Sequence, residues 1–273
     1  MTDEPTDPGA PGRKARYREG FEIPATARVG AAVRRAVGRI LAPRRPMLSI
    51  CGDSHLLPIE YAYKAGWFGP VRCRFRRVGG ATAVGLRHPT SKTEALTIFR
   101  RALLPARPGV VPVFQLGEVD CGFVIWHRAA KYGESVEAQL DASVAAYITF
   151  VDELRAAGYP TVILTAATVP TIVDGALDRP ESAGEVALLR ASVTASLAER
   201  TALTARYNER LRSAAAARGL PFVDLTPDLI DPSTGVVADR FRHVRAEDHH
   251  LHPVEGGRLW ARRLTEALAS LSR

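Results

Sequence analysis

The sequence has few cysteines and lysines, and it lacks a long apolar run. Its cysteines are Cys51, Cys73 and Cys121, too few for a disulfide framework, which favours a reducing compartment. No apolar segment approaches the length needed to span a bilayer. The opening residues, MTDEPTDPGAPG, are acidic and rich in proline and glycine, so we expect no secretory signal. These absences predict a soluble, cytoplasmic protein.

The positive charge comes almost entirely from arginine. The formal net charge is +8, and the only lysines are Lys14, Lys64, Lys92 and Lys131. Arginine and alanine enriched together indicate a coding bias, and no zinc-finger spacing or RNA-binding signature accompanies them. We therefore do not expect a nucleic-acid partner. Hydrophobic residues make up 46% and charged residues 24%, a balance typical of globular domains.

We divide the chain into residues 1–46, a tail followed by a basic helical segment, and one domain over 47–273. Residues 1–20 have the composition of a disordered tail. In 25–41, apolar residues recur at helical spacing, namely Val29, Val33, Val37 and Leu41. Such a helix could dock on a partner or an anionic membrane surface. We favour a solvated helix with one face packed on its own domain.

From residue 47 onward, short apolar runs alternate with helical stretches. The expected strands are 47–51, 71–78, 110–116, 161–168 and 221–225, and the expected helices are 56–65, 91–104, 135–157, 187–218 and 255–271. This alternation predicts a parallel sheet of five strands with helices on both faces. Such sheets bind ligands at the carboxyl ends of their strands. Asn208, in the middle of the fourth expected helix, should be exposed or locally bonded.

A Gly-Asp-Ser-His turn at 52–55 follows the first expected strand directly and precedes a helix. Backbone N–H groups at such a point can stabilise negative charge. A serine nucleophile needs this placement, together with an oxyanion pocket and a nearby base. Taken alone, Ser54 is better explained as a turn or capping serine.

Polar or glycine-rich segments also follow later strands. Gly79 and Gly80 come after the second strand, and Gly-Glu-Val-Asp at 117–120 comes after the third. Before the last helix, the segment 247–252 reads Glu-Asp-His-His-Leu-His. Its histidines could supply a base oriented by a carboxylate, form an inert loop, or bind zinc. We rank these possibilities in that order.

Together, these four segments resemble the SGNH (GDSL-type) hydrolase superfamily over residues 47–271. The resemblance implies a flavodoxin-like three-layer α/β/α sandwich that needs no metal or organic cofactor. It implies Ser54 as nucleophile, which also offers its N–H to the oxyanion hole with Gly80 or Gly79. The family's base matches His250.

One departure from the family pattern is in the third segment. The family has asparagine where this chain has Val119, so a side-chain oxyanion donor is missing. Losing such a donor costs roughly two to three orders of magnitude in rate. Polar residues near the same strand ends are expected to contact substrate, namely Asp53, His55, Glu118 and Asp120.

The second departure concerns the acid that orients the base. Glu247 stands three residues before His250, where the family has aspartate, and Asp248 stands two before it. Either Glu247 orients His250, or Asp248 pairs with a histidine in another register, including His249 or His252. Both arrangements remain open at this point.

These residues predict a serine-dependent ester hydrolase that acts through an acyl-enzyme. The expected substrate is a small ester, an acylated metabolite or an acylated sugar. An acyltransferase of the same type is the first alternative, because both share the covalent half-reaction. A catalytically weak binding domain is the second alternative, suggested by Val119.

Overall fold

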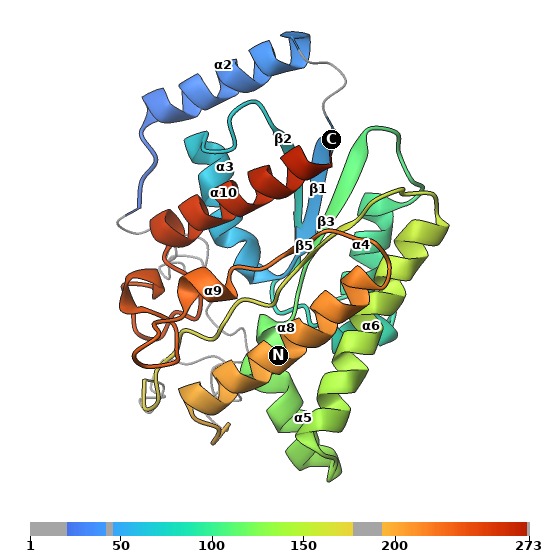
Figure 1. Ribbon diagram of the computed structural model, residues 1–273, viewed down its shortest axis with the longest axis vertical. Helices are drawn as coiled ribbons and strands as arrows, with labels where there is room; N and C mark the ends of the chain where they lie inside the picture. Colours follow the sequence, from blue (N-terminus) through green and yellow to red (C-terminus); the bar gives the residue numbers. More distant parts are fainter. Residues whose placement is uncertain (1–20, 42–45, 177–192, 272–273) are drawn as a thin grey trace, which may run out of the picture.

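The computed structural model describes residues 21–41, 46–176 and 193–271, so the predicted disordered tail lies outside the described residues. Five strands form one sheet in the order β2-β1-β3-β4-β5, and every pair is parallel, as predicted. The strands are β1 (Met47–Gly52), β2 (Arg72–Arg77), β3 (Val110–Gln115), β4 (Ile163–Thr165) and β5 (Phe222–Val223). They stand side by side in the middle of the molecule (Figure 1).

Helices cover both faces of the sheet, which makes the predicted three-layer sandwich. The helices are α2 (Ala25–Leu41), α3 (Leu57–Ala65), α4 (Ala95–Leu103), α5 (Ile125–Tyr132), α6 (Val136–Ala156), α8 (Leu197–Ala216), α9 (Thr226–Leu229) and α10 (Pro253–Ser270). No described helix is both long and apolar enough to cross a bilayer.

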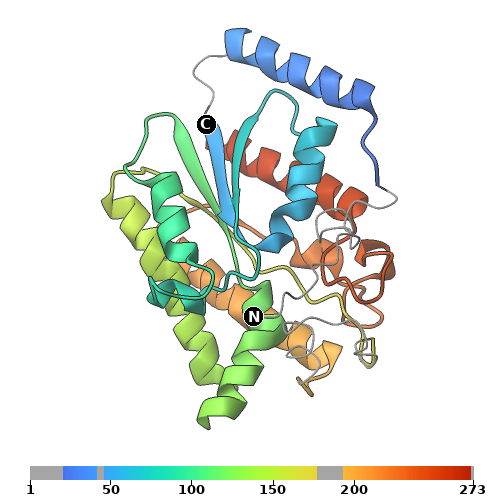
Figure 2. The same cartoon turned by 180° about the vertical axis from the view of Figure 1, so that it is seen from behind.

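Alternating strand residues build two separate cores. In β1, Leu48 and Ile50 pack with residues of α3 and α10, including Trp260. Cys51 points to the opposite face and joins the core formed with α4, α6 and α8. This alternation follows from the two-residue period of a strand, and Figure 2 shows the two groups of helices on either side of the sheet.

Two helix boundaries differ from the predictions for a local reason. Helix α8 begins at Leu197 rather than at 187, because Ser196 and Glu199 form a capping box there; residues 187–192 lie outside the described residues. Helix α10 begins at Pro253, and the His252 side chain accepts hydrogen bonds from the first free N–H groups.

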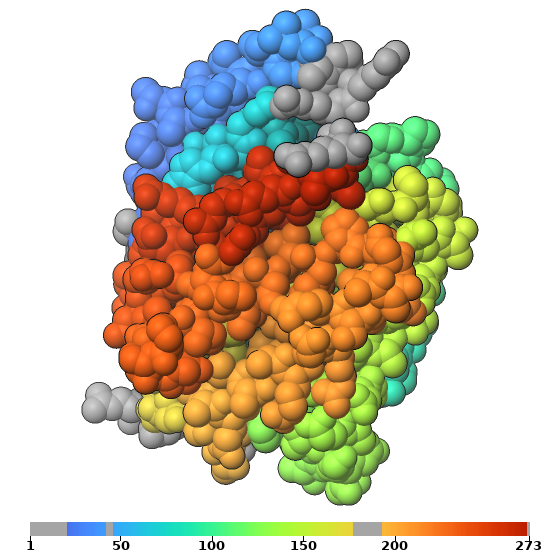
Figure 3. Space-filling view, viewed as in Figure 1, coloured from blue at the N-terminus to red at the C-terminus, as the bar shows by residue number. Residues whose placement is uncertain are grey.

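The helix predicted at 25–41 is present as α2, and one of its faces packs on the domain, although this face does not carry the valine row. Ala31 is its buried residue, and Arg35 donates a 3.0 Å hydrogen bond to the Tyr63 carbonyl on α3. Val29 and Val33 are instead 63% and 56% exposed. The small side chain of Ala31 allows close helix packing, so the valine row faces outward. Figure 3 shows α2 along one end of the face covered by α8 and α10.

Candidate active site

The order of the strands makes the carboxyl ends of β1 and β3 a topological switch point. The chain leaves β1 for β2 on one side and returns to β3 on the other, and ligands bind at such switch points in parallel sheets. Asp53, Ser54 and His55 follow β1, while Glu118 follows β3. Strand β1 can approach β3 here because residue 52 is glycine: a Cβ on Gly52 would lie 2.2 Å from the Gln115 carbonyl oxygen.

The turn after β1 exposes its serine and buries the residues on either side. Asp53 Oδ1 accepts a 2.8 Å hydrogen bond from the His55 backbone N–H and lies 3.0 Å from His55 Nδ1. Both side chains are buried, whereas Ser54 is partly exposed. Of residues 53–55, Ser54 is therefore the one whose side chain is not buried.

A second carboxylate holds the same histidine. Glu118 Oε2 lies 3.1 Å from His55 Nε2, and Glu118 is only 1% exposed. His55 thus bridges the ends of β1 and β3 through Asp53 and Glu118. Asp53, His55 and Glu118, predicted as substrate contacts, lie together at one point of the sheet edge, where their buried side chains contact one another.

Asp120 positions the loop that follows β2. Its carboxylate accepts hydrogen bonds from the Ala83 and Val84 N–H groups, at 2.7 and 3.0 Å, and from Ser143 Oγ at 2.7 Å. Burial raises the pKa of Asp120, although these hydrogen bonds oppose the rise. Asp120 is fully buried, so its geometry supports a positioning role and not a substrate contact.

The loop anchored by Asp120 carries both candidate oxyanion glycines. Gly79 and Gly80 are exposed, and Gly80 has a φ of 73°. This left-handed backbone is strained for residues with a Cβ. At the start of this loop, the Val78 N–H donates a 2.9 Å hydrogen bond to the Gly52 carbonyl. This bond fixes the loop to the end of β1.

No asparagine compensates for Val119. Asn208 is the only asparagine of the chain, and it is 2% exposed in α8. Its Oδ1 accepts a 2.7 Å hydrogen bond from the Ala167 N–H, and its Nδ2 donates a 3.0 Å bond to the Ala167 carbonyl. The expectation that Asn208 is exposed or locally bonded is therefore wrong.

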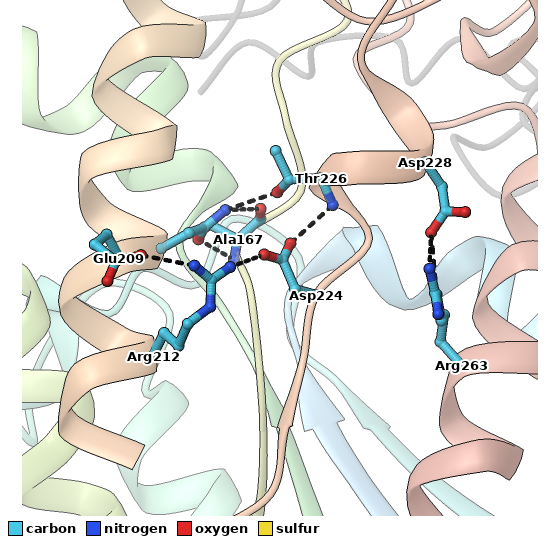
Figure 4. A network of polar contacts seen from close by, with 8 residues as sticks. Ala167, Glu209, Arg212, Asp224, Thr226, Asp228 and Arg263 are labelled. Carbon is cyan, nitrogen blue, oxygen red and sulfur yellow. Dashed lines mark hydrogen bonds and ion pairs between the residues drawn. The ribbon is translucent and has the colours of Figure 1, made fainter. Parts of the chain in front are cut away.

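Asn208 belongs to a network that fixes the carboxyl end of β4. In the sequence, the only sign of this role is a polar residue in the middle of a helix. Figure 4 shows α8 joined to the segment before α9 through this network. Asn208 Nδ2 also donates to Thr226 Oγ1 at 3.2 Å. Arg212 pairs with Asp224, whose Oδ1 accepts a 2.8 Å bond from the Thr226 N–H. These contacts join the segment after β4 to α8 and to the segment before α9.

Before α10, Asp248 and not Glu247 reaches the candidate base. Asp248 Oδ1 lies 2.6 Å from His250 Nδ1 and accepts a 3.0 Å bond from the His250 backbone N–H. Glu247 is exposed. His252 caps α10 with its Nδ1, accepting from Val254 and Glu255. The structure thus pairs Asp248 with His250, which is neither of the two arrangements considered from the sequence.

The C-terminal loop brings this histidine to the turn that carries Ser54. The ring centroids of His250 and His55 are 5.0 Å apart, and His55 Nε2 lies 3.3 Å from the His249 carbonyl oxygen. Burial lowers the pKa of His250 below its ordinary value of 6.5, although Asp248 opposes this effect. In a neutral imidazole whose Nδ1–H donates to a carboxylate, Nε2 is the unprotonated nitrogen.

The protein is an α/β sandwich of the flavodoxin-like type. The turn with Ser54 and the pair Asp248–His250 lie at its switch point. No protein-family model matches the chain, and no curated protein matches it. Solved structures of GDSL- and SGNH-type hydrolases share the fold.

Three such structures illustrate the likeness. A candidate acylhydrolase from Bacteroides fragilis has 17% identity and a TM-score of 0.56, over 89% of this chain and 98% of that chain. A GDSL-like lipase from Bacteroides thetaiotaomicron has 13% identity and a TM-score of 0.54, over 95% and 97%. A carbohydrate acetylesterase family member from Sinorhizobium meliloti has 15% identity and a TM-score of 0.53, over 82% and 98%. At these identities the likeness establishes the shared fold.

Proposed function

We propose that this protein is a serine-dependent ester hydrolase of the SGNH type. The observation that carries the proposal is the meeting of two distant segments. Asp248 holds His250 at 2.6 Å, and the His250 ring lies 5.0 Å from the ring of His55, the residue after Ser54. An acid, an imidazole and a serine at one sheet edge are the parts of a nucleophilic triad.

In the proposed reaction, His250 Nε2 takes the proton from the Ser54 hydroxyl as its oxygen attacks the ester carbonyl. The resulting oxyanion accepts hydrogen bonds from the N–H groups of Ser54 and Gly80. As the intermediate collapses, the imidazolium of His250 protonates the leaving alkoxide. Water then attacks the acyl-enzyme, again with His250 as base, and the acid product leaves Ser54 free.

The oxyanion donors are backbone N–H groups, since Val119 replaces the family's asparagine and Asn208 is occupied elsewhere. We therefore expect slower turnover, by roughly two to three orders of magnitude, than with an added side-chain donor. A carbohydrate acetylesterase family member from S. meliloti shares the fold. Acetylated carbohydrates are therefore the first substrates to assay.

The test is Ser54→Ala, assayed on p-nitrophenyl acetate and by labelling with a fluorophosphonate probe. We expect the variant to fold, to lose turnover by at least about 10³-fold and to lose labelling. Ser270→Ala is the matched control, because this exposed serine lies at the last turn of α10. Wild-type turnover in Ser54→Ala would reject the proposal.

A further inference from the structure

Three imidazoles converge beside the proposed catalytic serine. His55, His249 and His250 each offer a ring nitrogen, and these three nitrogens all lie within 4.8 Å of one another. The ring centroids are 5.2 Å apart for His55 and His249, and 4.1 Å apart for His249 and His250. The sheet edge thus gathers nitrogen donors from two segments that are remote in sequence.

Two of the three rings are already oriented by carboxylates. Asp53 Oδ1 lies 3.0 Å from His55 Nδ1, and Asp248 Oδ1 lies 2.6 Å from His250 Nδ1. Histidines that bind metals usually direct one ring nitrogen to a carboxylate in this way, which fixes the ring and increases the basicity of the other nitrogen. Nε2 is therefore the coordinating atom of both His55 and His250.

Glu118 adds an oxygen donor to the same place. Its Oε2 lies 3.1 Å from His55 Nε2. Two ligands bound tetrahedrally to zinc at about 2.0–2.1 Å are separated by roughly 3.3 Å. The His55–Glu118 distance is close to this value. The three imidazole nitrogens form the cluster, and Glu118 lies beside His55 as the candidate fourth ligand.

We propose that His55, His249, His250 and Glu118 bind Zn²⁺, and that the bound ion inhibits the ester hydrolysis proposed above. The inhibition rests on the proposed function, because coordination occupies the Nε2 lone pair with which His250 accepts the Ser54 proton. Imidazole nitrogen suits zinc and neighbouring transition metals, whereas Mg²⁺ and Ca²⁺ prefer sites made of oxygen. Inhibition is therefore selective for zinc over magnesium.

The test uses the full chain, treated with a chelator and then exchanged into metal-free buffer. Zn²⁺ is titrated into the protein by calorimetry and, in parallel, into the p-nitrophenyl acetate assay; Mg²⁺ is titrated as the control ion. We expect saturable binding of one Zn²⁺ per chain, inhibition over the same concentrations, and neither effect with Mg²⁺.

Two variants assign the site. His249→Ala should weaken Zn²⁺ binding by at least about 10-fold and raise the inhibitory zinc concentration equally, with inhibition measured relative to the variant's own metal-free rate. His88→Ala is the matched control, since His88 is exposed and outside the cluster; it should bind zinc like the wild type.

Several results would overturn the proposal. These are no saturable binding to the wild type, unchanged binding in His249→Ala, or a chelated enzyme that is inactive and regains activity with Zn²⁺. Ser54→Ala separates this proposal from the proposed function. If it binds zinc but retains turnover, the serine mechanism fails while the metal site stands. If Ser54→Ala loses turnover and the wild-type protein binds no zinc, the proposed metal site is rejected and the serine mechanism stands.

Discussion

Replacing Asp248 tests the acid that the structure pairs with the candidate base. Asp248→Ala removes the oxygen that accepts from both His250 Nδ1 and the His250 backbone N–H, at 2.6 and 3.0 Å. The imidazole then loses the group that fixes its orientation and stabilises its protonated form during the reaction. Glu247→Ala removes the neighbouring carboxylate, which is exposed, and is the matched control.

The expected loss follows from these two contacts. Removing the acid of a serine triad lowers kcat by about 10⁴-fold, which corresponds to about 5.4 kcal/mol at 1.36 kcal/mol per tenfold. We expect a loss of about 10³- to 10⁴-fold in kcat for Asp248→Ala, with KM little changed. Glu247→Ala should stay within about twofold, because exposed substitutions usually change free energies by no more than ~0.5 kcal/mol.

The pH profile gives a second readout that a general loss of structure would not produce. Activity requires neutral His250, so it falls as pH drops through the pKa of His250, which burial holds below 6.5. The hydrogen bond and charge of Asp248 raise this pKa against the effect of burial. In Asp248→Ala the acidic limb of kcat/KM should therefore move to lower pH than in the wild type.

The assay measures kcat and kcat/KM on p-nitrophenyl acetate from about pH 5 to about pH 9, with circular dichroism to verify folding. A larger loss in Glu247→Ala than in Asp248→Ala would refute the assignment of the orienting acid. An acidic limb that moves to higher pH in Asp248→Ala would refute the electrostatic reasoning.

Two further predictions concern the oxyanion loop and the network behind the site. Gly80→Ala should cost about 1–2 kcal/mol in unfolding free energy, because φ is 73° there, and lower kcat by up to about 10²-fold; equal losses in Gly79→Ala, the control, would contradict this. Asn208→Ala should lower the free energy of urea unfolding by about 2–4 kcal/mol, since it leaves the buried Ala167 N–H and carbonyl without their partner. An unchanged midpoint would disprove that role, and Glu209→Ala on the exposed side of α8 is its control.

The sequence by itself determined the sandwich and the strand ends at which chemistry is expected. Apolar runs of strand length alternate with helical stretches, and this periodicity leaves few arrangements other than a parallel sheet covered on both faces. The turn at 52–55 can also be predicted from the sequence, because it depends only on a Gly-Asp-Ser sequence that directly follows an apolar strand. The helix at 25–41 was likewise readable from its spacing, whereas its packing face was not.

Only the tertiary structure decided which side chains meet. Glu247 and Asp248 are adjacent in sequence, and the loop conformation before α10 turns Asp248 toward His250 and leaves Glu247 in solvent. Asp120 and Glu118 are two residues apart, yet one anchors the loop after β2 while the other reaches His55. Such differences depend on the path of neighbouring segments across the sheet edge, which no local pattern encodes.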